Sequence, residues 1–143
     1  MAGIAAERVH SAITTAWTAE EQRTYIERLN AREAIHVAVE SEIVGLQTLE
    51  KGTFVSMMHV AQIGTFLTPA ARGRGIGRQL FEHTKSFAIA NHYAKIFIQV
   101  RASNIHAQGY YMSLGFTECG LLRRHVCIDG VFDDGLLMEL PLQ

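Results

Sequence analysis

The chain has 143 residues, which is long enough for one domain with a buried core. Its 48% hydrophobic and 19% charged residues are ordinary for a globular protein, and a net charge of −1 provides no overall basic field to attract nucleic acid. The sequence has no signal-peptide pattern and no apolar run near the ~20 residues of a membrane span, and its two cysteines are too few for a disulfide framework or a thiolate metal site. We therefore expect one domain over residues 1–143 in the cytoplasm, without nucleic-acid, membrane or metal partners.

The first predicted elements are a helix and a strand. Residues 1–17 have only a weak helical pattern, but Thr18-Ala-Glu-Glu21 has the spacing of a capping box, which starts a clearer helix. Residues 34–40 alternate between apolar and other side chains, as in a half-buried strand. The expected apolar stripe of the helix is Tyr25, Ile26 and Leu29, and the shared face of the strand is Ile35, Val37 and Val39.

Two further strands are predicted before the middle of the chain. A short turn at 41–42 leads into a strand over 43–49. Residues 57–67 predict a third strand, in which Gly64 is a candidate bulge and which Pro69 ends.

The second half alternates helix and strand and closes with a hairpin. A helical pattern over 76–90 stops at Asn91, and 94–100 alternates with Ile96, Ile98 and Val100 on one side. Ser103 or Asn104 can cap a short helix to about Ser113, which Gly115 can terminate in a left-handed conformation. Two last strands flank a strong turn dipeptide: 116–128, Asp129-Gly130 and 131–140. The expected fold class is α+β.

The segment between the third strand and the next helix is Arg72-Gly-Arg-Gly-Ile-Gly-Arg78. Glycines can adopt positive φ, so several N–H groups can converge on one anion beside the positive end of the helix. A dinucleotide-binding fingerprint requires glycine where this chain has Arg78, and a Walker loop requires a Gly-Lys-Ser/Thr ending that is absent. The pattern Arg-x-x-Gly-x-Gly is met by Arg72, Gly75 and Gly77, which favours a phosphate-binding loop over a turn that binds nothing.

Three blocks in order carry a family resemblance: the 72–78 loop, Val100-Arg-Ala-Ser-Asn104, and Tyr111-Met-Ser-Leu-Gly-Phe116. From about Ile35 onward the chain resembles the GNAT superfamily of acyl-CoA-dependent N-acetyltransferases. The resemblance implies the GNAT fold: a mixed, mostly antiparallel sheet with a splayed parallel strand pair, flanked by helices. It also implies acetyl-CoA as co-substrate and an amine as acceptor.

The resemblance further implies roles for individual residues. Main-chain groups of the loop would bind the pyrophosphate, with the charges of Arg72 and Arg74 reinforcing them; those residues are Gly73, Arg74, Gly75, Ile76, Gly77 and Arg78. The pantetheine arm would contact the main chain of Thr65, Phe66 and Leu67. Asn104 matches an asparagine that contacts the cofactor arm, or is a plain helix cap. Tyr111 matches the tyrosine that protonates the departing thiolate, or is a core aromatic.

The general base departs from the family pattern. The similar ribosomal-protein alanine N-acetyltransferases carry glutamate before the Val-Arg-Ala-Ser-Asn segment, where this chain has Gln99, an amide that accepts no proton at neutral pH. His59 on the third strand, Glu40 or a chain of waters are alternatives. Because a free α-amino group has a pKa of about 7.7–8.0, against about 10.4 for lysine, loss of the glutamate favours a small α-amino acceptor.

Features at both ends of the chain concern the choice of acceptor amine. Residues 122–138 resemble the last hairpin of bacterial amino-acid N-acetyltransferases, where Arg123 and Arg124 can meet a carboxylate or remain solvated. The family's first strand has no counterpart before Thr18, which would leave a sheet edge for another segment or a second subunit of a homodimer to cover, unless the protein is truncated. The leading hypothesis is an acetyl-CoA:amine N-acetyltransferase with a small-molecule substrate. The rivals are a protein N-terminal acetyltransferase and a non-catalytic acyl-CoA-binding module.

Overall fold

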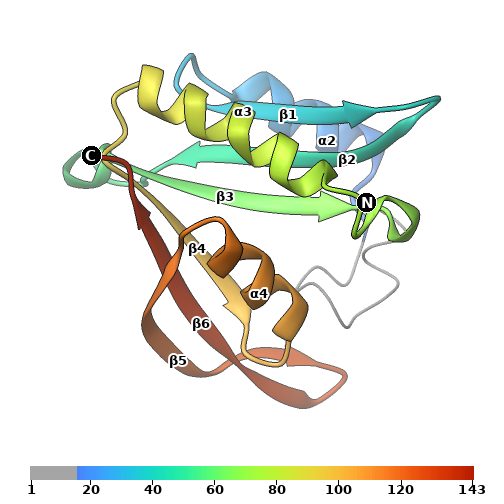
Figure 1. Ribbon diagram of the computed structural model, residues 1–143, viewed down its shortest axis with the longest axis vertical. Coiled ribbons are helices and arrows are strands. Elements are labelled where there is room, and N and C mark those ends of the chain that lie inside the picture. The colour runs from blue at the N-terminus through green and yellow to red at the C-terminus, as the bar shows by residue number, and fades with distance from the viewer. Residues whose placement is uncertain (1–15) are drawn as a thin grey trace. The chain divides into compact units, whose positions relative to one another are not determined.

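The computed structural model describes residues 16–143, so nearly all of the weak helical pattern at the N-terminus lies outside the described residues. Figure 1 shows helices interleaved with a sheet. The helices are α2 (Ala19–Arg28), α3 (Ile76–Ala90) and α4 (Ile105–Ser113), and the strands are β1 (Ala34–Val39), β2 (Ile43–Lys51), β3 (Val60–Leu67), β4 (Lys95–Arg101), β5 (Thr117–Ile128) and β6 (Val131–Pro141).

The described strands form one mixed sheet in the order β1-β2-β3-β4-β6-β5, with β3 and β4 parallel. The predicted α+β class with a mixed sheet is therefore confirmed. Within residues 16–143, β1 forms an edge of this sheet, and β2 is its one neighbour. By their contacts the residues divide into two compact units: Trp17–Ile96 with Pro141–Gln143, and a second unit that contains Phe97–Leu140.

In the first unit, α2 begins at the predicted capping box. The Glu21 N–H donates to Thr18 Oγ1 at 3.2 Å, and the Thr18 N–H donates to Glu21 Oε2 at 2.7 Å. The predicted apolar stripe is only partly realised, because α2 has no buried residue and Ile26 is 55% exposed. The helix is held instead by Tyr25, whose ring packs on Trp17 and whose hydroxyl donates to Glu50 of β2.

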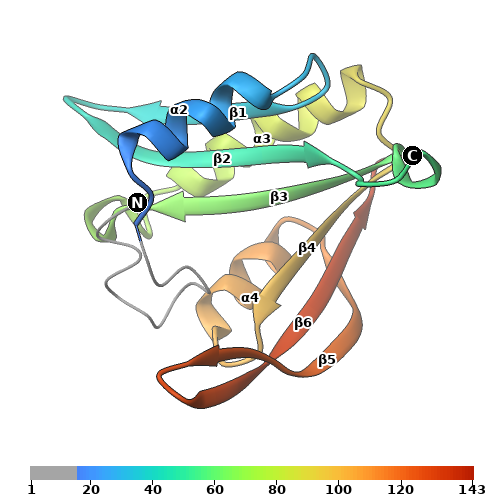
Figure 2. The same cartoon turned by 180° about the vertical axis from the view of Figure 1, so that it is seen from behind.

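The strands β1, β2 and β3 are antiparallel neighbours with α3 on one face and α2 on the other, as the two opposite views in Figures 1 and 2 show. The predicted apolar face of β1 is the more exposed one, since Val37 and Val39 are exposed. The α3 side of β1 carries His36 instead, whose Nδ1 lies 2.9 Å from Oγ1 of the buried Thr84. Burial, and then the neighbouring His83, lower the pKa of His36.

The third strand is shorter than predicted, and two expectations about it are wrong. It begins at Val60, because a 3-10 turn at Val55–Met57 occupies the residues before it. His59 therefore precedes β3 rather than lying on it, and its carbonyl accepts the Ala94 N–H at 2.8 Å. Gly64 is not a bulge in the β2–β3 pairing, where it lies opposite Thr48 in unbroken register.

The predicted helix over 76–90 is confirmed, and Asn91 ends it by donating its Nδ2 to the Phe87 carbonyl at 2.9 Å. Leucine and phenylalanine side chains of α3, Leu80 and Phe81, lie in the core of this unit. The chain returns to the unit at its end, where the Leu142 N–H donates to the Ala94 carbonyl at 2.8 Å.

In the second unit, the local signals in the sequence correspond to observed turns and caps. Asn104 caps α4, Gly115 ends it with φ 98°, and Asp129 and Gly130 form the hairpin turn with φ of 52° and 79°. The predicted alternation on β4 is confirmed, since Ile98 and Val100 are buried. The free thiols Cys119 and Cys127 are exposed on β5. None of the helices described here is long and apolar enough to cross a membrane.

Candidate functional site

The glycine-rich loop combines two left-handed glycines with the start of a long helix. Gly73 has φ 71° and Gly75 has φ 80°, while Gly77 is already inside α3 and buried. A Cβ at Gly73 or Gly75 would meet no atom within 4 Å, so these positions require glycine for backbone conformation and not for space.

The N-terminus of α3 is arranged for an anion. Its N-cap is Gly75, which has no side chain to accept the first-turn N–H groups as serine or aspartate would. The helix has 15 residues, so the positive end of its dipole falls at this loop. Backbone N–H groups and a helix N-terminus together form a common protein site for phosphate.

Two of the loop arginines make contacts within the first unit. Arg72 donates its Nη2 to the Leu67 carbonyl at 3.2 Å, which ties the loop to the end of β3. Arg74 donates to the Glu40 carboxylate, in an ion pair whose side chains are about half exposed, and to the Ala70 carbonyl at 3.4 Å. Arg78 is exposed on the first turn of α3.

The structure brings the end of β3 and the loop together and separates His59 from both. Thr65, Phe66 and Leu67 are the last residues of β3, and Thr65 Oγ1 accepts a hydrogen bond from the buried Gln47 at 2.8 Å. A strand rises about 3.3 Å per residue, so His59 lies roughly 20 Å along the chain from Thr65. This exposed histidine lies just before the opposite end of β3, away from the glycine-rich loop.

In the second unit, Asn104 and Tyr111 belong to the same side of α4. Seven residues are close to two helical turns, which aligns the two positions. The Asn104 Oδ1 accepts the Ala107 N–H at 3.0 Å, which confirms its role as a cap. Tyr111 is 6% exposed, and its ring lies 5.3 Å from that of Phe116 and 4.8 Å from that of Tyr110.

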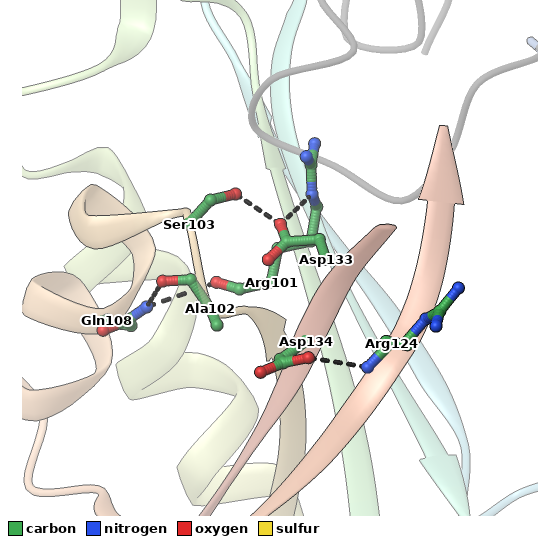
Figure 3. A network of polar contacts seen from close by, with 7 residues as sticks. All are labelled: Arg101, Ala102, Ser103, Gln108, Arg124, Asp133 and Asp134. Carbon is green, nitrogen blue, oxygen red and sulfur yellow. Dashed lines mark hydrogen bonds and ion pairs between the residues drawn. The ribbon is translucent and has the colours of Figure 1, made fainter. Parts of the chain in front are cut away.

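A polar network that the sequence did not predict fixes the segment before α4 (Figure 3). Arg101 Nε donates to Asp133 Oδ2 at 2.9 Å, and Ser103 Oγ donates to the same oxygen. Gln108 Nε2 donates to the Ala102 carbonyl at 2.7 Å. Burial alone would raise the pKa of Asp133, but the hydrogen bonds from Ser103 and Arg101 outweigh it and lower this pKa. The spacing of these residues gave no signal, because β4 and β6 are distant in sequence.

A second unpredicted feature is a bulge in β5. The β5–β6 register shifts between Leu122 and Val126, and Arg124 has φ 49°, which is uncommon for a residue other than glycine. Asp134 of β6 clamps the bulge, since its Oδ1 accepts the Arg124 N–H at 2.6 Å (Figure 3). Its carbonyl accepts the Ala102 N–H at 2.8 Å, so Asp134 links the bulge to the end of β4.

No cluster of three or more histidine, cysteine, aspartate or glutamate side chains suited to a metal ion occurs in the described part of the chain. The first unit therefore carries a loop whose backbone geometry suits an anion, at the N-terminus of α3. The chain belongs to the GNAT acetyltransferases, because the family model for the acetyltransferase (GNAT) domain matches residues 4–131.

Known proteins similar to the chain agree with this family. It is 34% identical over 74 residues to the [Ribosomal protein bS18]-alanine N-acetyltransferase of Salmonella typhimurium, a match covering 52% of this chain and 50% of the relative. The chain thus spans about half the length of the curated relatives it matches. The crystal structure of the ribosomal-protein-alanine N-acetyltransferase from Brucella melitensis has a TM-score of 0.85 at 24% identity, covering 92% of this chain and 83% of that one.

A further solved structure is the phosphinothricin acetyltransferase from Sinorhizobium meliloti in complex with acetyl-CoA. Its TM-score is 0.85 at 18% identity, with 93% of this chain and 74% of that chain covered. At these identities the likeness to solved structures establishes the fold, and the GNAT resemblance carried by the sequence motifs is confirmed.

Proposed function

We propose that this protein transfers the acetyl group of acetyl-CoA to a primary amine. The observation that carries the proposal is the loop at Gly73–Gly75, where two left-handed glycines, the second of them the N-cap residue, precede a 15-residue helix. This combination suits a pyrophosphate, and the chain belongs to a family of acetyltransferases.

The donor would be held mainly by main-chain groups. In this proposal the backbone from Gly73 to Arg78 binds the pyrophosphate, and Arg72 and Arg74 add charge. In this structure, Arg72 contacts the Leu67 carbonyl and Arg74 contacts the Glu40 carboxylate. In this proposal each guanidinium can retain that contact or replace it with a contact to a phosphate oxygen. The main chain of Thr65, Phe66 and Leu67 would contact the pantetheine arm, and the Arg72 contact to Leu67 supports a fixed geometry at that strand end.

The second unit would supply Asn104 to the cofactor arm and Tyr111 to the chemistry. Tyr111 is the proposed general acid, which donates its phenolic proton to the departing thiolate. The buried ring packed on Phe116 supports a fixed orientation of its hydroxyl.

The acceptor we propose is the α-amine of a small amino compound. Gln99 cannot accept a proton, and an α-amine with a pKa of about 7.7–8.0 is partly neutral near pH 7.5 without a strong base. One observation favours a second candidate, a peptide N-terminus: the matched Salmonella relative is named for a ribosomal-protein alanine.

A panel of acceptors at fixed acetyl-CoA tests both candidates. Free amino acids, alanine-initiated peptides and lysine side-chain analogues are compared by mass-spectrometric detection of acetylated product. Transfer to free amino acids above peptides supports the first candidate, and the reverse order supports the second. Tight acetyl-CoA binding without transfer to any acceptor would instead favour a non-catalytic acyl-CoA-binding module.

Cytoplasmic location and a homodimer stay predictions of this proposal. Sedimentation equilibrium over a range of concentrations tests the dimer. The exposed Val37 and Val39 on the edge strand β1 are the positions at which charged substitutions would dissociate it.

A further inference from the structure

An exposed histidine and the Gln99 amide both lie close to one glycine in the second unit. A Cβ built on Gly135 of β6 would lie 3.0 Å from Gln99 Nε2 and 3.4 Å from the Cβ of His125. The distance between Gln99 Nε2 and the Cβ of His125 therefore cannot exceed the sum of these two distances. Gln99 comes from β4 and His125 from β5, so three strands present this small group, the Gln99–His125 patch, on one face.

The bulge in β5 is what brings His125 to this patch. Leu122 pairs with Gly135 and Val126 pairs with Asp133, so the three residues 123–125 of β5 lie opposite Asp134 alone. In a regular ladder successive side chains alternate between the faces, and extra residues change which side chain reaches which face. Here His125 is exposed, and its Cβ lies beside Gly135.

The bulge is fixed rather than loose. Asp134 accepts the Arg124 N–H at 2.6 Å, and the Arg124 guanidinium carbon lies 4.0 Å from the centroid of the Phe132 ring. The cation–π contact and the carboxylate hold the two ends of residue 124, which keeps the neighbouring His125 backbone in place.

The two carboxylates that precede Gly135 on β6, those of Asp133 and Asp134, already have partners. Asp133 accepts from Arg101 and Ser103, and its lowered pKa keeps it a weak base. Asp134 is bound to the bulge backbone. Imidazole is the side chain whose ordinary pKa lies closest to neutral pH, which suits it to take a proton from an ammonium group.

We propose that His125 is the general base of the acetyl transfer, acting beside Gln99 where the similar alanine N-acetyltransferases carry a glutamate. The inference rests on the proposed function above. His125 takes a proton from the ammonium group of the acceptor, and the neutral amine nitrogen then bonds to the thioester carbonyl carbon. As the carbon–sulfur bond breaks, the thiolate receives a proton from Tyr111, and the second proton of the bonded nitrogen returns to the Tyr111 phenolate, leaving acetylated amine and free CoA.

The test compares His125→Gln with the wild-type enzyme, using the best α-amine acceptor and acetyl-CoA between pH 7 and pH 9.5. We expect kcat/KM to fall about 100-fold at pH 7 with an unchanged Kd for acetyl-CoA. The deficit should narrow to within about tenfold at pH 9.5, because an α-amine is then mostly neutral without a base. His92→Asn is the matched control: His92 is an exposed histidine in the first unit whose φ of 62° asparagine tolerates.

A second variant keeps the test decisive if His125→Gln disturbs the bulge. Adding Gln99→Glu to His125→Gln places a carboxylate on β4, across β6 from position 125, and should raise kcat/KM at pH 7 at least tenfold above that of His125→Gln. A wild-type rate in His125→Gln, a deficit that is equal at all pH values, or no recovery in the double variant contradicts the role of His125. A wild-type enzyme that neither binds acetyl-CoA nor acetylates any amine overturns the proposed function itself, and with it this inference.

Discussion

Single polar side chains do much of the structural work in the second unit. Asp133 holds both Arg101 and Ser103, whose positions precede the cap residue Asn104, and the ion-paired side chains of Asp133 and Arg101 are only 14% and 15% exposed. Removing one partner from a pair buried to this degree is more damaging than the loss of an exposed pair such as Arg74–Glu40.

We predict that Asp133→Asn lowers the free energy of unfolding by about 3 kcal/mol at pH 7. The folded state lowers the pKa of Asp133, so its contribution is present above the unfolded pKa of about 3.9 and is lost as pH falls through the folded value. Urea unfolding at pH 7 and pH 3 measures both effects. The gap between variant and wild type should shrink in acid, and the exposed Glu118→Gln serves as a control. An equal gap at both pH values would contradict this account of the pair.

We predict that Tyr111→Phe lowers kcat about 100-fold while the Kd for acetyl-CoA stays within twofold. The ring is buried against Phe116, so phenylalanine keeps its packing and removes only the hydroxyl. Steady-state kinetics with a saturating amine and equilibrium binding separate the two quantities. Full activity in this variant would remove Tyr111 from the chemistry.

At the scale of elements, local signals predicted the ends of helices and hairpins well. The capping box at Thr18, the cap at Asn104 and the turn at Asp129-Gly130 each depend on neighbours within three residues, and each is observed. The loop at 72–78 was found in the same way, because positive φ at Gly73 and Gly75 is a property of glycine itself.

Features that depend on pairing between distant segments were missed. The β5 bulge is stabilised by the hydrogen bond from the Arg124 N–H to Asp134. No local sequence pattern at residues 123–125 predicts an arginine with positive φ. The half-buried position of His36 depends on Thr84 of α3, whereas Val37 and Val39 of β1 lie on the more exposed side. The strand β3 begins at Val60 and not at residue 57, because the 3-10 turn at Val55–Met57 ends only at residue 57.

We predict that substituting Gly75 separates conformational from steric effects at the loop. A Cβ there meets no atom within 4 Å, so Gly75→Val should lose about 1–2 kcal/mol of stability through its φ of 80°, and Gly75→Asn less. Thermal unfolding measures the loss, and acetyl-CoA titration should show weaker binding in the order glycine, asparagine, valine. Equal affinities in all three proteins would count against main-chain binding of the pyrophosphate.

At the scale of the whole molecule, the charges are nearly balanced. With a net charge of −1, long-range attraction of an anionic cosubstrate is weak, and binding must come from the local arrangement at the loop. Ligand binding to the folded state alone then shows directly in the stability of the protein.

We predict that acetyl-CoA at one hundred times its Kd stabilises the folded protein by about 2.7 kcal/mol, which corresponds to a rise in Tm of roughly 8 °C. Differential scanning fluorimetry measures the rise in Tm, and the Gly75→Val variant is measured at the same ligand concentration for comparison. A free acetyl thioester without the nucleotide part should produce almost no shift, and a shift of equal size with it would contradict binding through the phosphates.

The exposed cysteines of β5 affect how turnover can be observed. A colour reagent that detects free CoA by disulfide exchange also reacts with the accessible thiols of Cys119 and Cys127, so the protein contributes a background signal before any acetyl group moves. Serine at both positions would silence that background. Restoring either cysteine alone would then offer a single attachment point for a fluorophore on β5, the strand that carries the bulge.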